Sequence, residues 1–120
     1  MFKYYNANPL GRNVSDCAVR AISLATNRSW DDTYKELSEF ARREGITFSE
    51  IEFLNNYLID NFQRCYLDRR KIHSIKDFLD LNLKGIYLIT MPEHITCVID
   101  GILYDTFDCS DDNFWCVYRV

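Results

Sequence analysis

Apolar residues recur at helical spacing through the first half of the chain. After Asp16, which occupies the position of a helix N-cap, the segment from Cys17 to about Asn27 carries such a stripe. Ser29 opens a second helix, with an acidic residue three positions later, and Gly45 supplies its stop. The first 45 residues therefore predict a loop followed by two helices.

Two more helices are expected before the pattern changes. A third begins at Thr47 or Ser49, and a fourth, short helix starts at Ser74 and runs through Leu81. Between them, the segment from Arg64 to Leu67 predicts a short strand. This half of the chain is thus expected to be mainly helical.

Beyond Gly85 the sequence turns to β-forming residues. The Asp100-Gly101 pair between two such runs is a strong hairpin signal, because both positions of a type I′ turn need a positive φ. Helices followed by antiparallel strands are typical of an α+β fold. The expected strands are 86–91, 94–100, 102–107 and 114–120.

Composition indicates the general class of protein but does not indicate which reaction it catalyses or which ligand it binds. A chain of 120 residues, 48% of them hydrophobic, predicts one globular domain over residues 1–120. The net charge of −4 disfavours nucleic acid as a partner. We expect no signal peptide, no membrane span and no cofactor. Five irregularly spaced cysteines without a C-x-x-C pair indicate free thiols and a cytoplasmic location.

Cys17 is the first candidate for chemistry. It directly follows the predicted N-cap, in the first turn of a helix. The free N–H groups and the dipole there favour negative charge, and a thiol attacks carbonyl carbon as its thiolate. A neighbouring imidazole would complete the activation. We therefore interpret Cys17 as a nucleophile and look for its base.

The predicted hairpin pairs His94 with one particular acid. If Asp100 and Gly101 form the turn, Thr96 lies opposite Asp105, and alternation places His94 and Asp105 on the same face as diagonal neighbours. Such a diagonal spans roughly 7–8 Å between backbone positions, which suits a carboxylate–imidazole hydrogen bond. Asp108 would emerge on the opposite face and is kept in reserve.

These residues suggest the roles of a catalytic triad. His94 takes the proton of Cys17 and later protonates the leaving group, while Asp105 orients the imidazole. The backbone N–H of Cys17 can serve an oxyanion hole, and Asn13, in the loop before it, is our choice for the second donor.

The order of these residues resembles the papain-like cysteine peptidase superfamily. A cysteine opens an early helix, a histidine opens a strand, and an acid lies on the next strand. The segments Asp16–Ile22 and His94–Thr106 are similar to small papain-fold proteins of phages and bacteria. The resemblance covers nearly the whole chain in element order. One departure is that no Gln precedes Cys17, although these enzymes usually place an oxyanion Gln there.

The resemblance implies a papain-like fold in which the nucleophile helix comes first and a C-terminal antiparallel sheet follows. It also implies a cysteine hydrolase, with peptidase as the leading label, that forms an acyl-enzyme on a peptide or isopeptide bond of a peptide or protein. A phage-encoded protein of this kind would act in the host cytoplasm. The oligomeric state is left open.

Three other functions remain open at this point. A deamidase or an acyltransferase uses the same triad. The missing Gln and small size favour a non-enzymatic binding module, such as a phage-encoded inhibitor of a host protein. A zinc site from His94, Cys97, Cys109 and Cys116 is disfavoured, because strand alternation separates His94 from Cys97. We therefore expect no metal.

Overall fold

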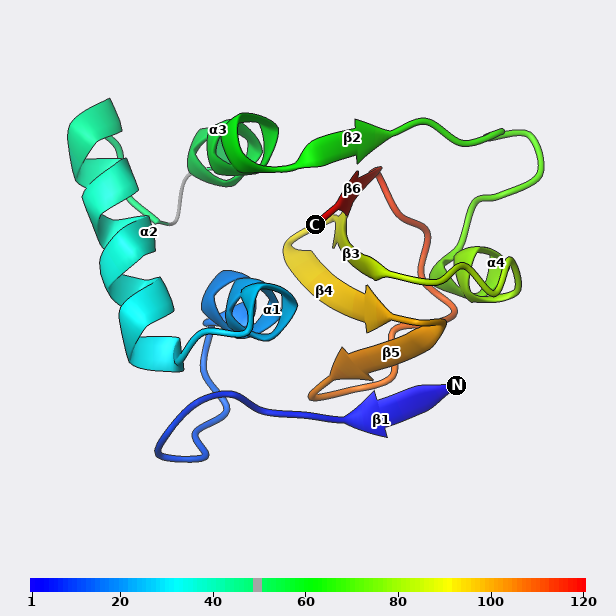
Figure 1. Cartoon of the computed structure of the whole chain (residues 1–120), viewed down its shortest axis with the longest axis horizontal. Coiled ribbons are helices and arrows are strands. Elements are labelled where there is room, and N and C mark those ends of the chain that lie inside the picture. Colours follow the sequence, from blue (N-terminus) through cyan, green and yellow to red (C-terminus); the bar gives the residue numbers. More distant parts are fainter. Residues whose placement is uncertain (49–50) are drawn as a thin grey trace.

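The computed structural model of the chain, which describes residues 1–48 and 51–120, has an α+β architecture built on a six-stranded sheet (Figure 1). The strands follow the order β1-β5-β4-β3-β6-β2 across the sheet. They are β1 (Phe2–Tyr4), β2 (Gln63–Cys65), β3 (Ile86–Met91), β4 (His94–Ile99), β5 (Ile102–Asp105) and β6 (Cys116–Arg119). The helices are α1 (Cys17–Thr26), α2 (Trp30–Glu44), α3 (Ile51–Asn61) and α4 (Ile75–Leu79).

Polar end groups define the helices much as the sequence predicts. The hydroxyl of Ser29 accepts a hydrogen bond from the backbone N–H of Asp32 at 3.0 Å, and Gly45 ends α2 with a φ of 70°. At α4, Ser74 and Asp77 form a reciprocal capping box. The third helix does not begin at Thr47, and the alternative start, Ser49, lies outside the described residues.

The Asp-Gly hairpin has the predicted register. Asp100 and Gly101 have φ values of 50° and 79°, as a type I′ turn requires. Cys97 lies opposite Tyr104, and the other two pairs down to the turn match as well. Asp105 directly follows the last residue of β5 that pairs with β4, and its side chain returns to the same face as His94.

The sheet is mixed, which corrects the expectation of an antiparallel C-terminal sheet. β1 pairs parallel to β5, with Tyr4 opposite Asp105, and β2 pairs antiparallel to β6 from the other edge. Both edge strands come from outside the C-terminal region. β1 has only three residues, too few for alternation to reveal it, and the predicted strand at 64–67 is found at Gln63–Cys65.

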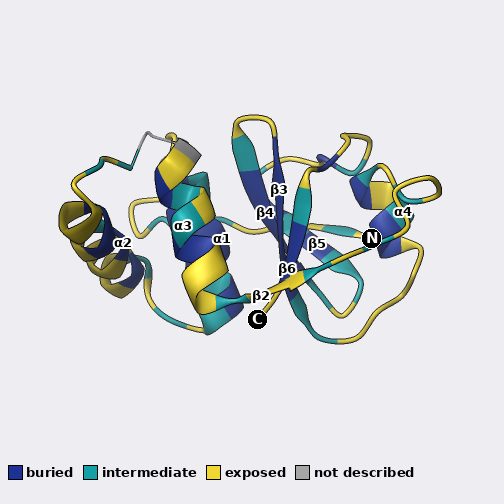
Figure 2. Cartoon of the chain, turned by 90° about the horizontal axis from the view of Figure 1, so that it is seen from above, coloured by how far each residue is buried: buried dark blue, intermediate teal, exposed yellow. Residues whose placement is uncertain are grey.

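The sheet separates two hydrophobic layers (Figure 2). Helices α1, α2 and α3 cover one face, where Ile22, Leu37 and Tyr57 pack against Leu88 and neighbouring apolar residues. The short helix α4 and the loop before β6 cover the other face. Helix α1 packs directly on β4, so its first turn lies close to the strand that begins with His94. This packing positions the candidate site.

Within the described part of the chain, no helix has both the length and the apolar character that crossing a bilayer requires.

Candidate active site

The side chains of His94 and Asp105 meet at neighbouring strand ends. His94 is the first residue of β4 and Asp105 the last of β5, and the antiparallel pairing brings these two ends together. His94 Nε2 lies 2.6 Å from Asp105 Oδ2. The ring of Phe107 lies 4.8 Å from the imidazole, centroid to centroid, and packs against it. The ring is thus held by a carboxylate at one edge and an aromatic neighbour.

Cys17 lies at the start of α1, as predicted, and lines the same cavity as His94, which acts on the pKa of its thiol. Because Nε2 of the ring is bound to Asp105, Nδ1 is the nitrogen left to serve the thiol. The structure therefore brings together the three residues that the sequence singled out. Their contacts come from one helix and two strands, which lie far apart in the chain.

Several groups act on the Cys17 thiol. Partial burial raises its pKa, but the hydrogen bond and the charge of His94 and the backbone N–H of Ile95 outweigh burial, so the pKa is lowered. Arg20, three residues along the same helix, lowers it further. A lowered pKa means that a larger fraction of Cys17 is thiolate at neutral pH.

The pKa of the His94 imidazole is shifted in the opposite direction, upward. Burial alone would lower the pKa of His94, but the hydrogen bonds to Asp105, Cys109 and Cys17 raise it to about 11. Burial likewise disfavours ionised Asp105, yet His94 and neighbouring donors keep the pKa of that carboxyl below its usual value. Relative to the isolated side chains, this arrangement therefore favours a thiolate, an imidazolium and a carboxylate.

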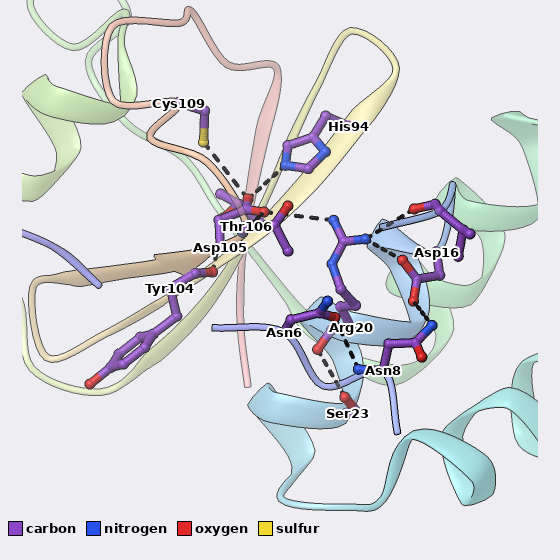
Figure 3. Close-up of polar contacts among 12 residues, drawn as sticks. Asn6, Asn8, Asp16, Arg20, Ser23, His94, Tyr104, Asp105, Thr106 and Cys109 are labelled. Carbon is purple, nitrogen blue, oxygen red and sulfur yellow. Dashed lines mark hydrogen bonds and ion pairs between the residues drawn. The ribbon is translucent and has the colours of Figure 1, made fainter. Parts of the chain in front are cut away.

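A buried arginine adds a second cation to the site (Figure 3). Arg20 is 7% exposed, and its guanidinium lies between the carboxylates of Asp16 and Asp105. It forms an ion pair with Asp16, and its Nη2 lies 3.7 Å from Asp105 Oδ1. It also donates to the carbonyl of Val14 at 3.2 Å. Asp105 is therefore shared between a cation on α1 and the imidazole on β4.

Asp16 occupies the N-cap position of α1 but does not cap it through its side chain. Its carboxylate instead accepts hydrogen bonds from Trp30 Nε1 at 3.0 Å and from Asn8 Nδ2 at 3.2 Å, besides pairing with Arg20. The predicted capping interaction is therefore wrong, because a buried cation and two other donors compete for the same oxygens. The Asp16 side chain therefore accepts no hydrogen bond from the backbone N–H groups in the first turn of α1.

A cavity of about 650 Å³ opens beside Cys17 and His94. It lies between the start of α1, helices α2 and α3, and the turn that joins β3 to β4. Thr90, Asn55 and Glu93 are among its polar lining residues. Most of the wall is apolar, and it includes Val19, Leu37, Phe48, Phe53, Leu54, Met91 and Trp115. No arginine or lysine of the described residues lines it.

The predicted oxyanion donor and the reserve acid are not among the residues that contact Cys17, His94 or Asp105 in the described part of the chain. Asn13 is exposed and is not among the residues that line the cavity, whereas Ser15 is. Its role as an oxyanion donor therefore stays a prediction. Asp108, the reserve acid, is exposed and accepts a hydrogen bond from the backbone N–H of Ser110 at 3.0 Å.

The other cysteines divide between the two faces of the sheet. Cys97 is buried among the residues beneath α1–α3, where burial raises its pKa to about 12. It therefore points away from His94, as alternation predicts. Cys109 lies on the other face, with its Sγ 3.9 Å from Asp105 Oδ2.

His94, Asp105 and Cys109 form the one group among the described residues whose ligand atoms could surround a metal ion, all within 4.8 Å of one another. Two of these atoms already share a short hydrogen bond, and the guanidinium of Arg20 lies beside the same carboxylate. A bound cation would face that positive charge across a few ångströms. The donor set is thus better suited to the imidazole–carboxylate pair than to a metal.

Sequence reasoning missed Arg20 as part of the site and missed the role of Asp16. The signal present was their i, i+4 spacing, which places a carboxylate and a guanidinium on one side of a helix. The cavity had no local signal, because its wall combines residues from α1, α2, α3 and the β3–β4 turn.

Comparison with known proteins adds no relative: the chain matches no protein-family model, no curated protein sequence and no solved structure.

Proposed function

We propose that this protein is a cysteine hydrolase of papain-like arrangement that acts on a peptide or isopeptide bond through an acyl-enzyme. The observation that carries the proposal is the 2.6 Å contact between His94 and Asp105 next to a thiol at a helix N-terminus. The lowered pKa of Cys17 and the raised pKa of His94 agree with an ion pair ready to react.

The reaction follows from these residues. The thiolate of Cys17 attacks the carbonyl carbon, a C–S bond forms, and the carbonyl electrons move to oxygen. The backbone N–H of Cys17 faces the developing oxyanion. As the intermediate collapses, His94 gives its proton to the departing nitrogen, and the C–N bond breaks. Water, deprotonated by His94, then attacks the thioester and releases the acid and the thiol.

The cavity supports a substrate whose acyl side is large and apolar. Its wall is mostly apolar, and the only ionisable side chains of the described residues that line it, besides Cys17 and His94, are the carboxylates of Asp16 and Glu93. Asp16 is already occupied by three donors. An anionic group would find no arginine or lysine in the described wall, and the His94 imidazolium is already paired with Asp105, while an apolar group would be removed from water.

Trapping the acyl-enzyme tests the proposal. The protein is mixed with p-nitrophenyl octanoate, quenched in acid after a few seconds, digested and analysed by mass spectrometry. We expect an octanoyl group on the peptide that contains Cys17, and none there in His94→Ala. Cys65 and Cys116, which are partly exposed, serve as internal controls. An octanoyl group spread evenly over these cysteines would refute the proposal.

A further inference from the structure

Arg20 carries a buried positive charge that no hydrolytic step uses. A buried guanidinium is costly unless it is paired, and here two carboxylates and one carbonyl surround it. One carboxylate, Asp16, precedes the nucleophile in the chain. The other, Asp105, orients the base. The same cation thus contacts both sides of the reaction centre.

These contacts close a ring of five residues. Asp16 pairs with Arg20, Arg20 with Asp105, Asp105 with His94, and His94 with Cys17. The ring is closed covalently, because Asp16 and Cys17 are joined by a peptide bond. With Cys17 as thiolate, charge alternates along the series from Asp16 to Cys17, and the two negative ends of the series are the residues joined by that peptide bond. Figure 3 shows the guanidinium of Arg20 between the two acids, with the imidazole of His94 also beside Asp105.

We propose that Arg20 is a positioning residue that ties the nucleophile helix to the carboxylate that orients His94. The inference rests on the proposed function and adds a second cation to the site. Arginine suits this place because its planar fork can address two carboxylates at once, whereas one ammonium group cannot do so with the same geometry.

The position of Arg20 has two electrostatic consequences. Burial raises the pKa of the Cys17 thiol, and the charge of Arg20 opposes that effect by stabilising the thiolate, in addition to the larger lowering by His94. Arg20 also shares the negative charge of Asp105, which weakens the hold of that carboxylate on the imidazolium. His94 can then release its proton to a leaving group more readily than it would beside an unshared carboxylate.

The test uses a variant that removes opposite charges together. Arg20→Met alone would leave Asp16 buried without a cation and Asp105 with His94 as its one cation among the described residues, and the protein could fail to fold. Asp16→Asn combined with Arg20→Met avoids that imbalance. The matched control is Glu39→Gln with Arg42→Met, which removes an exposed ion pair on α2. Arg20→Lys is the conservative variant.

The readout is the rate of Cys17 alkylation by iodoacetamide from pH 4 to pH 10, measured by mass spectrometry of the Cys17 peptide. We expect the apparent pKa to rise by about one unit in Asp16→Asn/Arg20→Met, so that alkylation below that pKa slows about tenfold. Arg20→Lys should recover part of the shift, and the α2 control should match the wild type.

Failure of each proposal gives a different result. A wild-type Cys17 with the pKa of an ordinary thiol would refute the proposed function, and this inference with it. A lowered wild-type pKa that is unchanged in a folded Asp16→Asn/Arg20→Met protein would overturn this inference alone. A slower reaction at every pH without a shift in pKa would also overturn it, because a structural role alone predicts that result.

A measurement on the wild type covers the case in which the double variant does not fold. In a ¹⁵N NMR titration, the guanidinium resonance of Arg20 should move with the same apparent pKa as Cys17 alkylation. The resonance of exposed Arg42 should not move with that pKa. An Arg20 resonance that stays fixed while Cys17 titrates would contradict the inference.

Discussion

Oδ2 of Asp105 lies 2.6 Å from His94 Nε2, while Oδ1 of the same carboxylate lies 3.7 Å from Nη2 of Arg20. One buried acid therefore faces two cations, each from a different layer of the fold. The contact with His94 fixes the ring, and the contact with Arg20 connects that ring to the helix of Cys17. Substitutions at and around this carboxylate should therefore change the chemistry of Cys17 as well as that of His94.

Asp105→Asn should slow acylation of Cys17 by about 10²-fold, the lower end of what a positioned acid–base group contributes. The amide oxygen can still accept from Nε2, so the ring stays near its place, but the neutral amide no longer raises the pKa of His94. The imidazolium is then lost at a lower pH, and the alkaline side of the pH–rate profile should move down. Stopped-flow release of p-nitrophenol measures both effects.

Asp108→Asn is the matched control, because Asp108 is exposed and lies three residues further along the chain. It should leave the rate and the profile unchanged. An equal loss of acylation rate in Asp105→Asn and Asp108→Asn would contradict the role of Asp105 in orienting His94.

The raised pKa of His94 also predicts how stability depends on pH. In Cys17→Ala, Asp105 still raises the folded-state pKa of His94 above its ordinary value of 6.5. The stabilisation is fully present below pH 6.5 and is lost as the pH rises toward the folded-state pKa. The free energy of unfolding should fall by up to about 1.4 kcal/mol per pH unit over that interval.

Urea unfolding of Cys17→Ala between pH 6 and pH 9 measures this slope, and Cys17→Ala/His94→Gln provides the comparison. The difference in slope between the two proteins belongs to His94. Parallel slopes would show that His94 has an ordinary pKa in the folded protein.

A substitution that fills the cavity should slow the reaction of substrates with large acyl groups and leave the reaction of those with small acyl groups unchanged. Leu54→Trp places extra volume in the wall beside Cys17. If it excludes two methylene groups of an octanoyl chain, about 1.6 kcal/mol of burial is lost, and the rate with p-nitrophenyl octanoate falls about tenfold relative to p-nitrophenyl acetate. The ratio of the two rates is the quantity to measure.

Ile59→Trp is the control for this change, because Ile59 lies on the same helix with its side chain exposed. It should leave the ratio unchanged. A ratio that does not change in Leu54→Trp would mean that the acyl chain binds elsewhere.

Local sequence signals account for much of the fold. Gly45 and the Asp100-Gly101 pair occupy the positive φ values that the turns require, and the hairpin register follows from that turn alone. Because the register decides which side chains share a face, the turn also predicts that His94 meets Asp105. The parallel pairing of β1 escaped prediction, since Phe2–Tyr4 gains its partner from β5 about one hundred residues away.

The parts of the site that could not be predicted from the sequence depend on tertiary packing. The spacing of Asp16 and Arg20 indicates an ion pair along a helix, which on a surface would be worth little. Its importance comes from burial and from the approach of Asp105, neither of which a helical pattern shows. The cavity likewise exists only once α2 and α3 cover the first face of the sheet.

The measurement that tests the account most directly is the site-resolved rate of iodoacetamide alkylation at pH 6. Cys17 is compared with the partly exposed Cys65 and Cys116, in the wild type and in His94→Ala. We predict that wild-type Cys17 reacts at least about tenfold faster than either of these, as a thiol with a lowered pKa should, and that His94→Ala removes most of this advantage. Equal rates for all three cysteines in the folded wild-type protein would contradict the claim that Cys17 is an activated nucleophile.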